Sequence, residues 1–367
     1  MPYSLEDKLV VGISTRALFD LAEADQIYRS EGLGAYRAYQ RQHEDEPLAP
    51  GTALPLIRGL LSINARSSER LVEVILMSRN DAESSVRIFN STVAHELDIS
   101  RGAFCGGRDP WPYLNSFRCR LFLSAEPVDV VNALSAGFPA ALICPPPEQP
   151  HEEVDEVRIA FDADAVIFDG ASQDVYDQGG LVEFMRHESE RSAEPMLPGP
   201  FHSFLMALKE IQDKFPDNPP IRTALVTARN APAHKRVVNT LRNWGVRIDE
   251  TYFLGGISKA DVLSVLKPHI FFDDQMAHLK EAQLATPSAH VIRETATSVA
   301  LGDTRSATSL EEGRFWIDRI KADLKGEPTE VQPGEILVRD QEALLDLPDE
   351  EVQLDRSVEH TGPKPSL

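Results

Sequence analysis

An internal repeat constrains the fold of this chain more than any other feature of its sequence. Residues 26–51 align without a gap with residues 174–199, and seven of the 26 aligned positions are identical. Typical residue frequencies would give roughly one or two identities by chance. The similarity continues between residues 72–80 and 222–230, and between residues 103–125 and 252–274. This order and spacing predict an internal duplication that gives two halves with one fold.

The second half alternates short apolar runs with helical patterns. The apolar runs are residues 157–168, 223–228, 269–274 and 289–292. Between the first two runs, one helix face is formed by Phe204, Leu205, Leu208, Ile211 and Phe215. Strands that alternate with helices indicate a parallel sheet covered on both faces. We therefore expect an α/β protein with two Rossmann-like halves, each built on its own parallel sheet.

Chain length and two changes in composition suggest the domain boundaries. With 367 residues, 42% of them hydrophobic, the chain is long enough for two ordinary domains. A polar, proline-rich break covers residues 144–156, and from about residue 327 the sequence becomes acidic and contains several prolines. We expect a first half at residues 1–146, a second half at residues 147–325 and a disordered acidic tail at residues 326–367.

The net charge of −21 argues against a nucleic-acid partner, because binding to nucleic acids depends on clustered Lys and Arg. The N-terminus lacks a basic stretch followed by a long apolar one, and no apolar run approaches the length that spans a bilayer. These features predict a soluble, cytoplasmic protein without a membrane partner. Cys105, Cys119 and Cys144 lack CxxC spacing and are expected to be reduced thiols. The oligomeric state is left open.

Acidic residues follow two of the predicted strands in the second half. Asp162 and Asp164 form a DxD tripeptide after the apolar stretch that ends at Phe161, and Asp273 and Asp274 end a later run. Because the carboxyl ends of parallel strands meet at one edge of a sheet, we expect these side chains to lie together. Adjacent buried carboxylates need a metal ion or a basic neighbour. A DxD alone is weak evidence, since it also occurs in calcium loops, glycosyltransferase metal motifs and solvated turns.

Two further segments lie between these acids. A strand that ends at Thr227 brings a hydroxyl to the same edge, followed by Ala228 and Arg229, and the later segment GGISK ends at Lys259. Thr at a strand end usually reflects strand propensity. The complete order of DxD, Thr, Lys and DD is far more specific than any of its members.

Together, the segments FDADAVIF, LVTAR, GGISK and HIFFDD resemble in order the four motifs of phosphohydrolases of the haloacid-dehalogenase (HAD) type. The segments STRALFDL, LDISRGAFCGG and KPHIFFDDQM resemble the cytosolic 5'-nucleotidase family, type I. The resemblance runs from about Leu9 to Ala285 and leaves the tail uncovered. It implies a Mg²⁺-dependent phosphatase that acts on a nucleoside 5'-monophosphate.

The resemblance also implies a role for each motif residue. Asp162 would attack the substrate phosphorus and form an aspartyl-phosphate. Asp164 would protonate the leaving oxygen and then activate water. Thr227 and Ala228 would bind the phosphate, and Lys259 would neutralise charge on the phosphate and on Asp162. Arg229 and Asn230 would either help to place the phosphate or the base or form an ordinary polar helix start. The implied metal ligands are Asp162, Asp164 through its backbone carbonyl, Asp273 and Asp274.

Three residues near the acidic motifs are alternative candidates for these roles. Lys267 is closer in sequence to Asp273 than Lys259 is, but it would lie at the far edge of the sheet, as a surface residue. His269 and His278 flank the acids without the spacing of metal ligands, so we expect them to be structural.

Residues 170–215 lie where HAD enzymes insert a cap that covers the site and reads the leaving group. We expect a small helical cap here that selects the nucleoside. Phe184, Met185 and Phe201 would either stack on a base or pack into the core.

The repeat predicts that the first half is catalytically inactive. The site residues Asp162, Asp164, Thr227, Lys259, Asp273 and Asp274 correspond to Ser14, Arg16, Met77, Pro110, Ser124 and Ala125. An effector nucleotide bound near Arg16, with Arg79 nearby, is one hypothesis for this half. A purely structural role is the favoured one.

Three functions remain open at this point. Hydrolysis of nucleoside 5'-monophosphates is the leading hypothesis, since the resemblance supplies the substrate class. A HAD phosphatase of another small phosphate ester is the alternative. A non-catalytic nucleotide-binding scaffold would leave an intact set of motifs idle.

Overall fold

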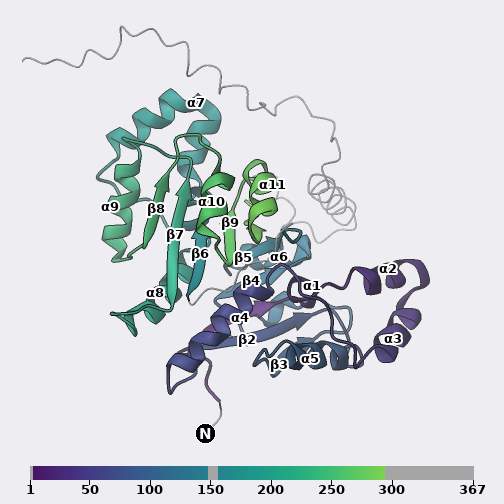
Figure 1. The fold of residues 1–367 in the computed structure, drawn as a ribbon. Helices are drawn as coiled ribbons and strands as arrows, with labels where there is room; N and C mark the ends of the chain where they lie inside the picture. Colours follow the sequence, from purple (N-terminus) through teal and green to yellow (C-terminus); the bar gives the residue numbers. More distant parts are fainter. Residues whose placement is uncertain (1–2, 148–155, 294–367) are drawn as a thin grey trace, which may run out of the picture. The chain divides into compact units, whose positions relative to one another are not determined.

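A computed structural model describes residues 3–147 and 156–293 of the chain (Figure 1). Ten strands form one sheet in the order β3-β2-β1-β4-β5-β10-β9-β6-β7-β8. Neighbouring strands are parallel, except β5 and β10, which pair antiparallel. The predicted α/β class is therefore confirmed. The predicted tail and most of the proline-rich break lie outside the described residues.

The strands of the first half are β1 (Leu9–Ile13), β2 (Val72–Ser78), β3 (Arg101–Phe104), β4 (Leu121–Ser124) and β5 (Ala140–Ile143). Those of the second half are β6 (Val157–Phe161), β7 (Ile221–Thr227), β8 (Glu250–Phe253), β9 (Ile270–Asp273) and β10 (Ser288–His290). The first half contains the helices α1 (Thr15–Leu18), α2 (Ala22–Glu31), α3 (Leu33–Gln42), α4 (Leu54–Ser62), α5 (Ser85–Ala94) and α6 (Pro127–Ser135). The second half contains α7 (Ala171–Glu190), α8 (His202–Asp213), α9 (His234–Trp244), α10 (Lys259–Leu266) and α11 (Met276–Ala285).

The expectation of two separate sheets was wrong. Strand β10 pairs with β5, so Ala289 lies opposite Ile143 and His290 opposite Leu142. Each strand would otherwise expose a row of unpaired backbone groups, and their pairing satisfies both rows. The apolar run at residues 289–292 indicated a strand here, but its sequence does not specify that β10 pairs with β5.

The two halves have the same strand order and the same register. In each, the strands follow the order 3-2-1-4-5 when numbered from the start of that half. Ile13 pairs with Leu76 in the first half, and Phe161 pairs with Leu225 in the second. Corresponding residues are thus 148 or 149 positions apart, as in the sequence repeat except for residues 72–80, whose alignment with residues 222–230 is off by one.

Helices cover both faces of the sheet. On one face, a single apolar core joins both halves and includes side chains from α4, α5, α8 and α9. On the other face, α6 packs over the first half, and α10 and α11 pack over the second. Among the described residues, no helix is both long and apolar enough to cross a bilayer.

The segment predicted as a cap has two parts of different character. Helix α8 buries Phe204, Leu205, Leu208 and Ile211 in the core, so it belongs to the layer that covers the sheet. The predicted cap boundary at residue 215 is therefore wrong. The cap prediction now concerns only α7 and the loop up to residue 201.

Helix α7 lies beyond the carboxyl ends of β6, β7 and β8 (Figure 1). It bends at Gly180, whose φ of 69° lies in the left-handed region that favours glycine. In the first half, Gly32, with a φ of 86°, separates α2 from α3 in the same way. The bend lets the two arms of α7 fold toward each other.

Candidate active site

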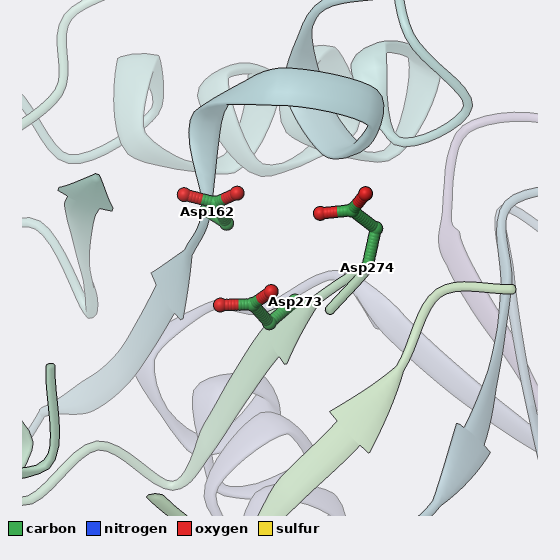
Figure 2. A group of neighbouring side chains, drawn as sticks. All are labelled: Asp162, Asp273 and Asp274. Carbon is green, nitrogen blue, oxygen red and sulfur yellow. The ribbon is translucent and has the colours of Figure 1, made fainter. Parts of the chain in front are cut away.

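Three buried aspartates meet at the carboxyl ends of β6 and β9. Asp162 directly follows β6, and its backbone N–H donates to the carbonyl of Phe272 at 2.7 Å. Asp273 ends β9, and Asp274 follows it. One carboxylate oxygen from each aspartate lies within 4.8 Å of the other two, and the three side chains gather at one point (Figure 2).

Lys259 supplies a positive charge to this cluster from the first residue of α10. The side chain of Ser258 caps this helix by accepting a hydrogen bond from the backbone N–H of Ala260. Lys259 Nζ lies 2.8 Å from Oδ1 of Asp162 and 2.7 Å from Oδ2 of Asp273. Lys267 is exposed at the other end of α10, so Lys259 is the lysine at the site.

The cluster holds more negative than positive charge. Burial, together with Asp273 and Asp164, raises the pKa of Asp162 to about 6 against the opposing effect of Lys259. Burial also tends to raise the pKa of Asp273, but Lys259 and His278 outweigh it and lower that pKa to about 2. Burial, Asp162 and Asp273 raise the pKa of Asp274 to about 9. Three carboxylates next to one lysine cannot all be ionised at neutral pH without a further cation.

The residues of the cluster fit a divalent cation. Oδ1 of Asp274 is buried and has no hydrogen-bond partner, as expected of an oxygen kept for a metal ion. Hard cations such as Mg²⁺ bind carboxylate oxygens and leave room for substrate oxygens and water. Within residues 3–147 and 156–293, no other group of three His, Cys, Asp or Glu side chains has this geometry.

Thr227 ends β7 at the same edge of the sheet as Asp162. Its buried side-chain oxygen accepts a hydrogen bond from the backbone N–H of Arg229 at 3.3 Å, which leaves its hydroxyl proton for another acceptor. Ala228 is exposed between them. The position at the strand end agrees with the predicted phosphate-binding role, which stays a prediction.

Arg229 is placed differently from the sequence expectation. Its side chain is buried, and its Nε and Nη2 donate to the two carboxylate oxygens of Asp164 at 2.8 and 2.6 Å. Its Nη1 binds the carboxylate of Glu188 on α7. All three guanidinium nitrogens are therefore engaged by protein groups, and direct binding of phosphate by this side chain stays a prediction that these contacts do not favour.

Two residues near the site were not recognised from the sequence. His278 Nδ1 lies 3.2 Å from Oδ2 of Asp273, so this histidine, which we expected to be structural, contacts the cluster. His269 is buried, and its Nδ1 accepts from the backbone N–H of Arg158, as a structural histidine does. Glu188 is fully buried beside Arg229. The repeat could have singled out Glu188, because the residue aligned with it in the first half, which is predicted to be inactive, is the neutral Gln40.

The aromatic residues proposed to stack on a base lie in two environments. Phe201 is fully buried, with its ring centroid 4.7 Å from that of Phe272, so it belongs to the core. Phe184 is buried, and the guanidinium carbon of Arg229 lies over the Phe184 ring, 5.1 Å from the ring centroid. Met185 is half-buried, and its contact with a base stays a prediction.

The corresponding positions of the first half form no carboxylate cluster. The side-chain oxygen of Ser14 accepts from the backbone N–H of Ala125, and that of Ser124 accepts from Glu126. The assignment of Met77 as the counterpart of Thr227 was wrong by one residue. By strand register, Ser78 corresponds to Thr227, so the first half retains a hydroxyl at this position.

The arginines of the hypothetical effector site are already paired with carboxylates. Arg16 Nε lies 2.7 Å from Asp25, and Arg79 lies 2.7 Å from Asp109 and 2.6 Å from Asp129. An anion bound there would have to compete with these groups. The effector site therefore stays an untested hypothesis.

The fold and the site define an α/β protein in which buried aspartates that could hold a metal ion meet a lysine at the carboxyl edge of a parallel sheet, where ligands of such folds bind. The family model described as 5'-nucleotidase matches residues 1–298. The chain therefore belongs to the 5'-nucleotidase family, which confirms the resemblance to that family.

Comparison with individual proteins gives a similar result. The chain is 35% identical over 294 residues to human cytosolic 5'-nucleotidase 1B, and the match covers 77% of this chain and 48% of that protein. The chain thus spans about half the length of this curated relative. No solved structure matches the chain.

Proposed function

We propose that this protein hydrolyses nucleoside 5'-monophosphates to a nucleoside and phosphate in a Mg²⁺-dependent reaction. The observation that carries the proposal is the contact of Lys259 with both Asp162 and Asp273, beside an unpaired buried oxygen of Asp274. Membership of the 5'-nucleotidase family supports the substrate class. The name of the human relative refers to the same activity.

In the proposed mechanism, Asp162 is the nucleophile. Lys259 Nζ lies 2.8 Å from Oδ1 of Asp162. The other carboxylate oxygen, Oδ2, can therefore attack phosphorus while Lys259 holds Oδ1. An Oδ–P bond forms, the bond from phosphorus to the ribose oxygen breaks, and a proton from Asp164 goes to that oxygen. A water molecule then gives a proton to Asp164 and attacks phosphorus, which frees Asp162 and releases phosphate.

The other residues of the site would stabilise the negative charge of the phosphoryl group during its transfer. The hydroxyl of Thr227 and the ammonium of Lys259 would donate to phosphoryl oxygens. Asp162, Asp273 and Asp274, with the backbone carbonyl of Asp164, would hold the cation. When bound, Mg²⁺ would neutralise the excess of carboxylates and polarise the phosphoryl group.

We also propose that the halves derive from a duplication of one HAD-type unit and that only residues from about 157 onward carry the chemistry. The shared strand order and register support this origin. Ser14 in place of Asp162, and Ser124 and Ala125 in place of Asp273 and Asp274, support an inactive first half.

The experiment is a measurement of phosphate release from a panel of nucleoside monophosphates and small sugar phosphates, with Mg²⁺ and with a chelator. We expect release from nucleoside monophosphates that requires Mg²⁺ and is lost in Asp162→Asn. A preference for the sugar phosphates would mean that the substrates are sugar phosphates and not nucleoside monophosphates. Absence of release from every ester would refute a hydrolytic function.

A further inference from the structure

A network of buried charges includes the proposed acid, Asp164, and its other three members have no role in the proposed mechanism. It consists of two carboxylates, Asp164 and Glu188, and two guanidinium groups, Arg229 and Arg236, all of them buried. Arg229 binds Asp164 through Nε and Nη2, and Glu188 through Nη1. The formal charges sum to zero, as a buried network requires.

Glu188 is the centre of this network. One carboxylate oxygen binds Arg229, and the other accepts from Arg236 Nη1 at 2.9 Å and from the hydroxyl of Ser172 at 2.8 Å. His187 Nδ1 lies 3.0 Å from this second oxygen. Burial tends to raise the pKa of Glu188, but Arg229 and Arg236 outweigh it and lower the pKa, so the group is a carboxylate.

These contacts tie three parts of the chain together. Ser172 and Glu188 belong to opposite arms of α7, which the bend at Gly180 brings into contact. Arg236 comes from α9, and Arg229 from the loop after β7. Glu188 therefore connects the segment over the strand ends to the residue that grips Asp164.

The first half contains the same framework without the charges. Arg87 Nη1 donates to the side-chain oxygen of Gln40 at 3.1 Å, and Arg87 Nε donates to the carbonyl of Glu46 at 3.0 Å. These contacts correspond to those of Arg236 with Glu188 and with the carbonyl of Glu194, the latter at 2.9 Å. A neutral amide is thus sufficient to build this packing.

Only the half that carries the aspartate cluster has a carboxylate at this position and an arginine at position 229. In the first half the residue that corresponds to Arg229 by register is Asn80. The charge on Glu188 is therefore associated with Asp164 and not with the fold of the segment.

We propose that Glu188 is a positioning residue that, through Arg229, fixes the orientation of the Asp164 carboxylate for proton transfer to the leaving oxygen. This inference rests on the proposed function. A bidentate guanidinium–carboxylate pair defines the plane of the carboxylate, and Glu188 fixes the guanidinium from its opposite side. Without Glu188, Arg229 would keep Asp164 as a partner but lose its own anchor.

The test compares two substrates that differ in their need for an acid. A ribose oxygen is a poor leaving group that needs a proton, whereas the phenolate of p-nitrophenyl phosphate leaves with little assistance. In Glu188→Gln we expect kcat/KM for a nucleoside monophosphate to fall roughly 10- to 100-fold. For the aryl phosphate we expect a fall of less than about threefold.

Glu190→Gln is the matched control, because Glu190 lies on the same arm of α7, is exposed and pairs with Arg186. It should change neither reaction. Ser172→Ala removes one hydrogen bond to Glu188 and should give a smaller change in the same direction. The variant Glu188→Gln should fold, since Gln40 occupies the corresponding place, and its Tm provides the check.

A second measurement does not depend on the aryl phosphate. If Glu188 acts through Asp164, Glu188→Gln should cause no further loss in an Asp164→Asn background. Equal losses for the two substrates, or additive losses in the double variant, would mean a structural role and overturn the inference. If the parent protein hydrolyses no phosphate ester, the proposed function fails first and the inference fails with it.

Discussion

Lys259 Nζ lies 2.8 Å from Oδ1 of Asp162, and both side chains are almost completely buried. The same ammonium lies 2.7 Å from Asp273, so one lysine connects the carboxyl ends of two neighbouring strands. A buried charge with two buried partners is sensitive to the removal of any one of them. The contact therefore links the stability of the site to its chemistry.

Replacement of Lys259 should affect both properties. In Lys259→Met, three carboxylates remain without their cation, so we expect the free energy of unfolding in a chelator to fall by about 3 kcal/mol. Phosphate release should fall at least about 100-fold, because a donor to the phosphoryl group is lost. Lys267→Met, at the exposed end of the same helix, should match the parent in chemical denaturation and in activity. An inactive Lys267→Met variant with an active Lys259→Met variant would reverse the assignment.

Neutralisation of Asp274 should stabilise the metal-free protein. Because its folded-state pKa of about 9 lies above that of an unfolded aspartate, the folded chain binds the extra proton and its stability falls as the pH rises toward 9. In a chelator at about pH 8, we expect Asp274→Asn to raise the Tm by about 2–4 °C. The gain should be smaller at about pH 6.

Added Mg²⁺ provides the counterpart to this experiment. It should raise the Tm of the parent protein by mass action, and raise that of Asp274→Asn much less. A parent Tm that does not respond to Mg²⁺ at any concentration would contradict the assignment of the cluster as a metal site.

Gly199 should be required for the turn that carries Asp164. A Cβ at this position would lie 2.2 Å from the carbonyl oxygen of Phe168 and 2.6 Å from that of Val166, both in or next to the turn after Asp162. We expect Gly199→Ala to lower the free energy of unfolding by at least about 2 kcal/mol and to reduce activity. Gly34→Ala in α3, where a Cβ would meet nothing within 4 Å, should be neutral or slightly stabilising. Equal denaturation midpoints for both variants would show that the turn tolerates the side chain.

The parts of the site that follow strands were predictable from the sequence. Asp162 and Asp273 end apolar runs, and parallel pairing brings the ends of such runs to one edge, so their proximity follows from pattern alone. The resemblance identified Lys259, and its position is consistent with GGISK lying at the start of a helix that begins at this edge.

The parts that depend on tertiary contacts were not predictable. Arg229 binds Glu188, which comes from a bent helix whose two arms meet only in the folded chain. The sequence therefore did not show that this guanidinium is engaged by protein groups. The single sheet depends on the pairing of β10 with β5, and the apolar run at residues 289–292 predicts a strand but not its partner. The mistaken pairing of Met77 with Thr227 arose from a one-residue offset that strand register fixes and sequence similarity does not.

The most direct test of the account is chemical trapping of the nucleophile during turnover. The protein is mixed with Mg²⁺ and a nucleoside monophosphate, quenched with borohydride, which reduces an acyl phosphate to an alcohol, and digested for mass spectrometry. We predict conversion of Asp162 to homoserine that depends on substrate and is absent at Asp164, Asp273 and Asp274. Turnover with an unmodified Asp162, or parental turnover in Asp162→Asn, would contradict the central claim.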